Sequence, residues 1–491
     1  MRTIKYLKYI LFSALVLATS CSKDDLEEIS PDRITMANFW VNETNAKTGI
    51  MEVYQNLTDN SWRFGENEMC PLYYRGDDVV LLPGASQWSY LAEMADFTYR
   101  NTSSILANFW WKKYRALNLA NWVLDNIDNV PEANIDDDMQ KYIKGEAYFL
   151  RGVLHMQLLQ NFEKIVLKQS AANNDNLNQG LSERTAAWTL ITEDFESASS
   201  LLPEKWDDSN LGRATKNSAY GFLGKALLFQ KEYALAHDAF TKIKGADLVS
   251  DYESLFNATN ENSVESIFEI QFSAIQAGGL SKSHSGSCTM ATGDFGGWNM
   301  FNPTQKLMNS FKQEKTTDDK FDKRLYASIA FDDPDATFLG KSARSYFDDN
   351  IVPKPSFKKY IESEDAVSTG VSGANFFWMR YADVLLMDAE ALAEQGNTTD
   401  ALPLINKVRF RAGLSEFSKT DKATVINEIR NQRFLEFNGE GIRFYDLVRW
   451  GIAKQEILNS DKLGNKNFKE PEHNYFPVPN GEIINNPNID E

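Results

Sequence analysis

The chain is poor in the residues from which metal sites and disulfide frameworks are built. Only three of its 491 residues are cysteine and four are histidine. The histidines are scattered singly and lack the paired spacing of a zinc site, so we expect no metal site built on them. They are His155, His237, His284 and His473. No motif indicates a cofactor, and we expect none.

Cysteine is too scarce for a disulfide-rich scaffold. Cys70 and Cys288 could form one disulfide in an oxidising compartment, or they could be two buried thiols. Spacing along the chain does not give their separation in space, and we favour two thiols.

Positive charge is also in deficit. The chain has 51 lysine and arginine residues against 69 aspartate and glutamate residues, a formal net charge of −18. Nucleic acids and anionic membrane surfaces attract proteins with a basic face. We therefore expect neither as a partner.

The N-terminus carries an apolar run, and it is too short to span a bilayer. Basic residues at positions 2, 5 and 8 precede the run Tyr9–Ala18, which ends in the small residues Ala18, Thr19 and Ser20. This order predicts a signal peptide over residues 1–20. Cys21 follows at once, as in bacterial lipoproteins whose N-terminal cysteine is acylated after cleavage, although Ala18 stands where leucine is usual. The alternative is an ordinary secretory signal followed by a chance cysteine.

Acidic residues follow the cysteine. Asp24, Asp25, Glu27 and Glu28 lie within residues 21–30. The segment resembles the short signal that directs lipoproteins of Bacteroides-like bacteria to the outer face of the outer membrane. A solvated linker is the alternative. We expect a protein anchored to the outer membrane by lipid and facing outward.

Two long segments repeat apolar residues at helical spacing. They are Ile105–Asn126 and Gln140–Phe162. Three aspartates, residues 136–138, precede the second segment and suit a helix start. A calcium loop is the alternative, but the Gly and Glu of such a loop are absent.

Self-similarity at the tetratricopeptide period is the more specific signal. In Ala219–Ile243, Gly224 and Ala236 are twelve residues apart, and Ala389 and Ala401 repeat this spacing in Leu385–Val408. A third unit would pair Gly145–Phe162 with Thr189–Pro203. The sequence thus predicts a mostly all-α fold, with tetratricopeptide-like helical hairpins forming a single domain over residues 31–491. Four long loops should gather on one side of it and carry function. They are residues 62–90, 170–183, 274–303 and 331–373.

The segment Ile426–Ala453 interleaves charged and aromatic residues. Arg430, Arg433 and Glu436 alternate with aromatic residues such as Phe434. Charges so close to apolar side chains must be paired, which favours a structural network of salt bridges. A ligand site is the alternative.

Several distinctive motifs follow one another along the chain. They are Asn108–Ile127, Gly145–Gly152 (GEAYFLRG), Arg213–Ala226, Arg380–Glu390 (RYADVLLMDAE), Ile405–Leu414, Glu428–Gly451 and Phe476–Asn488. Together they resemble the motifs of the SusD/RagB family of outer-membrane nutrient-binding lipoproteins. The matching pieces cover nearly the whole chain after Cys21, although the terminal Gln-Asn-Pro-Gly-Tyr usual in the family is absent.

The resemblance implies a glycan-binding protein without enzymatic activity that covers a SusC-type TonB-dependent transporter. A surface glycoside hydrolase, which would need two carboxylates across a cleft, is one alternative. A protein-assembly scaffold without a small ligand is another.

A sugar site combines exposed aromatic rings with polar side chains. Tryptophans on helical segments, including Trp111 and Trp378, are expected in the core, whereas three others lie in the long loops. We expect ligand contacts from these three and from nearby polar or aromatic residues, although the Tyr74–Asp77 stretch could instead be a turn held by an Arg–Asp pair. The candidates are Trp62, Tyr74, Arg75, Asp77, Trp88, Tyr90, Trp298, Asn299 and Tyr346.

Overall fold

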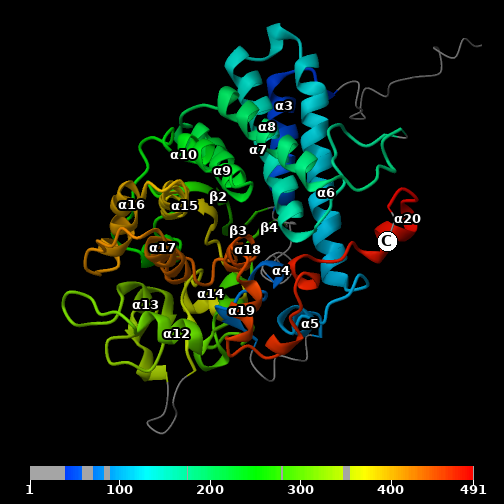
Figure 1. The fold of residues 1–491 in the computed structure, drawn as a ribbon. Helices are drawn as coiled ribbons and strands as arrows, with labels where there is room; N and C mark the ends of the chain where they lie inside the picture. The colour runs from blue at the N-terminus through cyan, green and yellow to red at the C-terminus, as the bar shows by residue number, and fades with distance from the viewer. Residues whose placement is uncertain are drawn as a thin grey trace, which may run out of the picture.

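The computed structural model describes residues 39–57, 70–81, 89–173, 175–277, 280–346 and 354–489. Its frame consists of helices that pack as antiparallel pairs (Figure 1). The helices of this frame are α3 (Glu43–Leu57), α6 (Ser104–Asn126), α7 (Asp137–Asn161), α8 (Arg184–Leu201), α9 (Lys216–Phe229), α10 (Tyr233–Phe240), α15 (Tyr381–Glu394), α16 (Thr398–Arg411) and α17 (Lys422–Glu436).

Shorter helices complete the described fold. They are α4 (Cys70–Tyr73), α5 (Ser89–Ala95), α11 (Gly286–Met290), α12 (Gln305–Phe311), α13 (Lys323–Ser328), α14 (Glu364–Thr369), α18 (Arg443–Arg449), α19 (Ala453–Leu458) and α20 (Asn480–Asn485). Within the described ranges, no helix is long and apolar enough to cross a membrane.

The mostly α-helical fold is confirmed, and so are the helical hairpins. The two repeat-like segments form α9–α10 and α15–α16, and the third unit forms α7–α8. Gly224 shows why a small residue is needed at its position, because a Cβ added there would lie 2.4 Å from the ring of Phe240 on α10. The missing side chain allows the two helices to approach closely.

Local signals at the start of α7 act as expected. Asp136 is the N-cap residue, and its carboxylate accepts hydrogen bonds from the backbone N–H groups of Asp138 and Met139, both at 3.0 Å. These bonds satisfy donors that the first turn of a helix leaves unpaired. Asp136 therefore caps the helix, and Asp137 and Asp138 belong to its first turn.

Strands are few and short among the described residues, and each pairs with one partner. β2 (Ser266–Ile270) and β10 (Phe376–Arg380) form an antiparallel pair across more than a hundred residues of chain. The other antiparallel pairs are β1 (Val79–Val80) with β5 (Asn302–Pro303), β3 (Ser273–Ala277) with β4 (Leu280–Lys282), β6 (Ile329–Ala330) with β9 (Ser356–Phe357), and β7 (Thr337–Phe338) with β8 (Lys341–Ser342).

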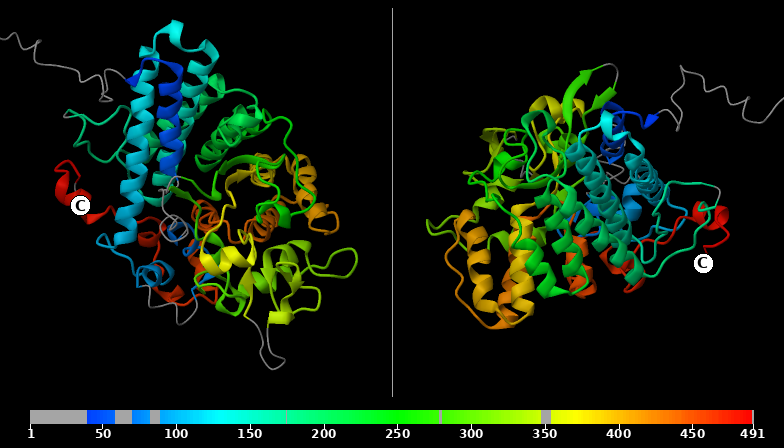
Figure 2. Two further views of the ribbon diagram at one scale, coloured as in Figure 1. Left: turned by 180° about the vertical axis from the view of Figure 1, so that it is seen from behind. Right: turned by 90° about the horizontal axis from the view of Figure 1, so that it is seen from above.

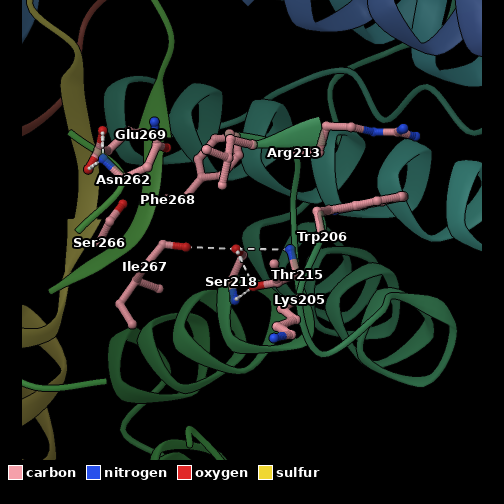
Figure 3. Close-up of a pocket in the computed structure, with 12 residues that line it drawn as sticks. Lys205, Trp206, Arg213, Thr215, Ser218, Asn262, Ser266, Ile267, Phe268 and Glu269 are labelled. Atoms are coloured by element: carbon pink, nitrogen blue, oxygen red, sulfur yellow. Dashed lines mark hydrogen bonds between the residues drawn. The ribbon is translucent and has the colours of Figure 1, made fainter. Parts of the chain in front are cut away.

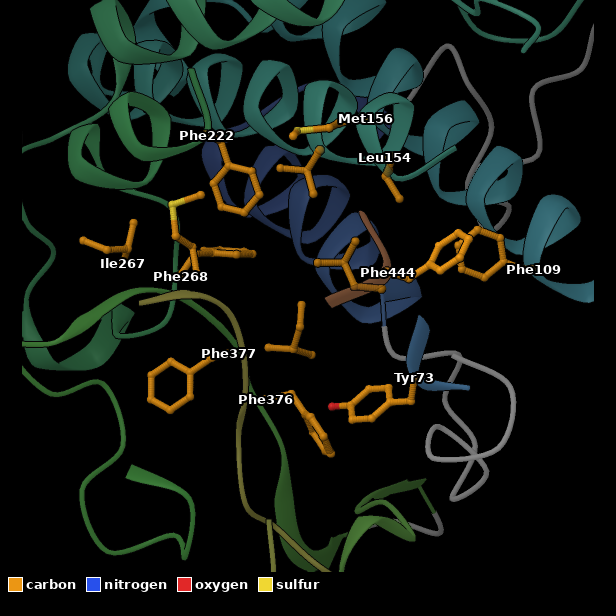
Figure 4. Packing of buried hydrophobic residues seen from close by; sticks show 14 of the residues in the cluster. Tyr73, Phe109, Leu154, Met156, Phe222, Ile267, Phe268, Phe376, Phe377 and Phe444 are labelled. Atoms are coloured by element: carbon orange, nitrogen blue, oxygen red, sulfur yellow. The ribbon is translucent and has the colours of Figure 1, made fainter. Parts of the chain in front are cut away.

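The main hydrophobic core lies between the helical pairs and the loop-rich half (Figure 4). Phe149 on α7 packs edge-to-face against Phe222 on α9, at 5.3 Å between ring centroids, and against Phe268 on β2, at 4.9 Å. Such aromatic pairs contribute roughly 0.5–1.5 kcal/mol beyond the area they bury. The β2–β10 pair is thereby fixed against the helical frame.

The motif charges at GEAYFLRG pair inside this frame. Glu146 binds the guanidinium of Arg213 at 2.6 Å, and Arg151 binds Asp194 at 2.6 Å. All four side chains are buried. These motif residues are thus structural, and they connect α7 to the start of α9 and to α8.

Two tryptophans expected in the helical core are placed differently. Trp111 is on α6, but 54% of its surface is exposed because it faces away from the neighbouring helices. Trp378 belongs to strand β10 and not to a helix. Its neighbours in sequence are apolar on both faces of a buried strand, a pattern that periodicity does not separate from a helix.

The long loops do not all gather on one side. The segments 274–303 and 331–373 meet around α14, whereas residues 170–183 lie beside α20 in both figures of the whole fold (Figures 1 and 2). The side-chain amide of Asn486 donates to the carbonyl of Gln179 at 2.8 Å. Contacts with the C-terminal segment hold this loop away from the other two.

Candidate functional site

The Tyr74–Asp77 stretch lies in the core and not at the rim of a ligand site. Tyr74, Arg75 and Asp77 have no exposed surface. Arg75 is placed over the rings of Phe444 and Phe476, at 4.2 and 3.9 Å from their centroids. The three candidates at this stretch are therefore corrected to structural residues, since a ligand has no access to them.

An Arg–Asp pair does hold this turn, but the arginine comes from another part of the chain. Asp77 binds Arg443 at 2.6 Å and Lys306 at 2.7 Å. Burial alone would raise the pKa of Asp77, but the two cations outweigh burial and hold the pKa well below its usual range. Asp77 is a buried anion that connects three distant segments.

Trp298 and Asn299 lie in a tightly folded loop after α11. The side-chain oxygen of Asn299 accepts a hydrogen bond from the Gly293 N–H at 2.7 Å and closes the loop. A Cβ on Gly297 would lie 2.1 Å from the carbonyl oxygen of Ala291, so only glycine fits there. This loop holds the half-buried ring of Trp298 beside Gly370, the C-cap residue of α14.

Tyr346 lies at the opposite end of α14. Its ring packs against Phe295 and Phe338, at 5.3 and 5.5 Å between centroids. Its hydroxyl donates to the Glu364 carboxylate at 3.1 Å, and the ammonium group of Lys341 binds the same carboxylate at 2.5 Å. Burial raises the pKa of Tyr346, and the neighbouring Glu364 raises it further.

A hollow of about 760 Å³ opens beside this arrangement. The segment 338–341, Lys358 and residues 361–365 line it, together with Glu253. Its size lies within the range of small-molecule pockets, about 300–1,000 Å³. Lysine and glutamate side chains line the hollow together with the ring of Phe338. The hollow therefore offers hydrogen-bond donors and acceptors to a ligand that carries hydroxyl groups.

Among the sequence candidates, the structure therefore brings Trp298, Asn299 and Tyr346 to the same part of the molecule. Tyr90 is half-buried on α5, which lies against α4. Trp62, Trp88 and Cys21 lie outside the described residues.

Strand pairing places Leu81 near the loop of Trp298. β1 pairs with β5 so that Val80 is opposite Asn302. The antiparallel register then directs Leu81, the last residue of the described range 70–81, towards residues 299–301. The chain thus leaves the described fold close to the loop of Trp298.

Sequence patterns missed the polar residues of the hollow. Lys341, Glu362 and Glu364 lie in segment 331–373, which was expected to be a loop throughout. It contains the short helix α14, whose N-cap Ser363 accepts a hydrogen bond from the Ala366 N–H at 3.1 Å. The Ser-Glu-Asp sequence at 363–365 is a helix-start signal that could have found α14.

Two adjoining smaller hollows lie between the helical frame and the β2 strand, and Figure 3 shows one of them. Its volume is about 150 Å³. The guanidinium carbon of Arg213 lies there over the Trp206 ring, 3.9 Å from the ring centroid. The Ser218 hydroxyl donates to the Ile267 carbonyl at 2.7 Å. Arg213 and Ser218 are thus already bonded to the protein, and the sequence candidates lie elsewhere.

The described part of the chain contains no group of three histidine, cysteine or acidic residues able to hold a metal ion. Cys288 is buried, and its thiol donates to the Ser285 carbonyl at 3.0 Å. The side chain of Cys70 lies outside the described atoms. That Cys70 and Cys288 are two thiols and not a disulfide stays a prediction.

Two family models match the chain. Residues 264–491 match the model described as the SusD family. Residues 28–228 match a SusD-like model described as "Starch-binding associating with outer membrane". The two matches do not overlap, and together they extend over most of the chain.

Curated relatives match over almost their full length. SusD-like protein P2 of Formosa agariphila is 24% identical, with 98% of each chain covered. A SusD-like protein of Bacteroides ovatus is 22% identical over 90% of this chain and 82% of that protein.

Solved structures share the fold. A SusD superfamily protein from Bacteroides vulgatus has a TM-score of 0.82 and 28% identity, covering 92% of this chain and 99% of that one. A laminarin-binding SusD-like protein has a TM-score of 0.77 and 23% identity, covering 92% of this chain and 99% of its own. A surface glycan-binding protein from Bacteroides thetaiotaomicron in complex with laminarihexaose has a TM-score of 0.76 and 20% identity, covering 90% and 98%.

Proposed function

The chain belongs to the SusD/RagB family, and from this we propose that it binds a glycan at the bacterial surface and delivers it to a SusC-type TonB-dependent transporter. We propose that it is a binding protein and not an enzyme, in keeping with the family model described as starch-binding. We place it at the outer membrane, held by a lipid on Cys21.

The observation that carries the glycan site is the arrangement around α14. Trp298 lies at one end of this helix and Tyr346 at the other, and the hollow of about 760 Å³ opens beside Tyr346's partner Glu364. The apolar face of a sugar ring suits an aromatic side chain, and its hydroxyls suit carboxylates and ammonium groups. We propose Trp298, Asn299 and Tyr346 as ligand contacts, with Trp62, Trp88 and Tyr90 as further candidates.

A titration of the mature protein against a polysaccharide panel tests this proposal. Laminarin belongs in the panel because two solved neighbours bind laminarin or its hexasaccharide, although their likeness to this chain supports the fold alone. At least one glycan of the panel should change the tryptophan fluorescence, and the change should saturate as the glycan concentration rises. Affinity should fall at least tenfold in a variant combining Trp88→Ala and Trp298→Ala.

Trp111→Ala is the matched control, because Trp111 is exposed on α6 and belongs to no proposed site. It should bind the glycan as the unaltered protein does. Undiminished affinity in the double variant would refute the site. Reducing ends released over time would instead favour the glycoside hydrolase.

Anchoring and delivery need their own experiments. Cys21→Ser should move the protein from the membrane fraction to the soluble fraction, because stable anchoring depends on acyl chains. Affinity purification from its native membrane should recover a TonB-dependent transporter. Recovery of such a partner with no glycan bound from the whole panel would favour the scaffold.

A further inference from the structure

A separate hollow of about 330 Å³ lies between α12, α17 and α19, the helices labelled in the lower half of Figure 1. Its volume is at the lower end of the range for small-molecule pockets. None of the sugar-site candidates lines it. It is formed largely by the C-terminal segment whose charges the sequence left open to either a structural or a ligand role.

One face of α17 supplies much of the lining. Three of the lining residues lie three, four and seven positions after Asn427, so all four side chains are on the same side of the helix. The four are Asn427, Arg430, Asn431 and Phe434. Gln455 on α19 completes the polar wall.

Arg430 differs from the other arginines of this segment. Arg433, Arg443 and Arg449 each bind at least one carboxylate, whereas Arg430 makes no ion pair with any residue in the described ranges. Its Nε atom is buried and has no hydrogen-bond acceptor there. Leaving a buried donor without an acceptor costs about 1–3 kcal/mol, a cost that an entering acceptor would remove.

The other two cations of the hollow are already neutralised. Lys306 binds Asp77 at 2.7 Å and Glu456 at 2.5 Å, and Arg443 binds the same Asp77 at 2.6 Å. Asp77 and Glu456 thus pair with Lys306 and Arg443, whereas Arg430 has no carboxylate partner among the described residues. A positive site of this kind stands out on a chain with a net charge of −18.

Uncharged amides surround this charge. The side chains of Asn427, Asn431 and Gln455 make no hydrogen bond with the described part of the protein. Each amide offers two donors and one carbonyl acceptor, which is the combination that sugar hydroxyls need. The planar guanidinium of Arg430, held 5.2 Å from the Trp450 ring, matches a planar carboxylate.

We propose that this hollow binds a small hydroxylated carboxylic acid of the uronic acid class. Arg430 takes the carboxylate, and the three amides contact the hydroxyls. The site is independent of the proposed glycan site at α14.

Calorimetric titration of the mature protein with glucuronate, at low ionic strength, tests the proposal. Glucuronate should bind saturably and glucose should not. Arg430→Gln should weaken glucuronate binding at least tenfold. Arg430→Lys keeps the charge but loses the planar fork, and should give an intermediate affinity.

Arg115→Gln is the matched control, because Arg115 is an exposed arginine that also lies over a tryptophan, 5.7 Å from the Trp111 ring. It should leave glucuronate binding unchanged. Trp298→Ala should do so as well, so failure of the glycan site and failure of this site give different results.

Two outcomes would overturn the proposal. Equal glucuronate affinity in a folded Arg430→Gln variant would remove Arg430 from the site. Equal affinity for inorganic sulfate and glucuronate would show that the amides recognise no hydroxyls and that any small anion suffices.

Discussion

Arg380 and Glu436 form a 2.5 Å ion pair in the interior, where the exposed fractions of the two side chains are 1% and 0%. Glu436 also binds Arg324, at 3.1 Å, and Arg411. Burial opposes the charge of Glu436, but the three guanidinium groups outweigh it and hold its pKa well below the usual range. One carboxylate thus joins β10, α13, α16 and α17.

Neutralising Glu436 should destabilise the fold strongly. Glu436→Gln leaves three buried guanidinium groups short of a counter-charge, so the free energy of unfolding should fall by about 3–5 kcal/mol. Urea denaturation followed by circular dichroism measures the change.

Asp335→Asn is the control for this variant, because Asp335 pairs with Lys320 at the surface with both side chains more than half exposed. It should cost less than about 1 kcal/mol. Similar losses from both variants would contradict the structural role assigned to the buried network.

Asp77 gives a test that separates folding from ligand binding. Asp77→Asn should lower the free energy of unfolding by several kcal/mol, since Arg443 and Lys306 lose their shared buried partner. At a temperature where the variant is folded, its glycan affinity should equal that of the unaltered protein. A large loss of affinity with little loss of stability would return Asp77 to the ligand site.

Because α9 and α10 approach closely at Gly224, adding one methyl group there should lower the free energy of unfolding. Gly224→Ala should destabilise the protein by about 1–3 kcal/mol because the new Cβ meets the Phe240 ring. This cost should exceed the gain of up to about 1 kcal/mol in helix propensity. Thermal unfolding is the measurement.

Gly481→Ala provides the opposite expectation. Gly481 is on α20, and an added Cβ would meet nothing within 4 Å. The substitution should be neutral or slightly stabilising. If both alanine variants gained stability, the close packing of α9 against α10 would be wrong.

His155 predicts a pH effect. Burial is the main cause that lowers its pKa to about 3, and the charge of Arg151 lowers it further. Between pH 4 and 6 the unfolded chain therefore binds a proton at His155 that the folded protein does not. This difference in proton binding makes the free energy of unfolding rise with pH across that interval. The pH dependence from His155 disappears as the pH falls below its pKa in the folded protein.

Substitution isolates this term from those of other groups. In His155→Gln, the free energy of unfolding should rise less steeply from pH 4 to pH 6 than in the unaltered protein. The expected difference in slope is up to about 1.4 kcal/mol per pH unit, the value for one proton. His237→Gln is a comparison of another kind, because His237 is partly exposed and pairs with Asp388 at 2.6 Å, so its removal tests an ion pair and not the burial of a neutral ring. Identical slopes in His155→Gln and the unaltered protein would refute a neutral buried His155.

The sequence predicted the helical frame because its signals are local. Apolar periodicity, the aspartates before α7 and the small residues at Gly224 and Ala236 each act within a few turns of helix. Such signals identified the hairpins and their partners. They failed for Trp378, where a short buried strand and a helix have the same apolar pattern.

Part of the candidate site was also within reach of the sequence. Trp298 and Tyr346 were proposed because they are aromatic residues in long loops, and the structure places both half-buried around α14. Their contact with a ligand stays a prediction. Tyr74, Arg75 and Asp77 were expected to be polar neighbours of those rings, yet all three are buried. Their partners Phe444, Phe476 and Arg443 are hundreds of residues away, so no local pattern could give their burial.

The sequence by itself determined the main helical hairpins and which segments carry the aromatic and charged side chains. Only the tertiary structure decided which of those side chains are buried and paired in the interior and which face a hollow. Arg433 and Arg430 are three residues apart on one helix, yet one is neutralised by Asp383 and Asp446 while the other lines a pocket without an ion pair among the described residues. The physical reason is that burial and charge pairing depend on contacts between distant segments, which only packing creates.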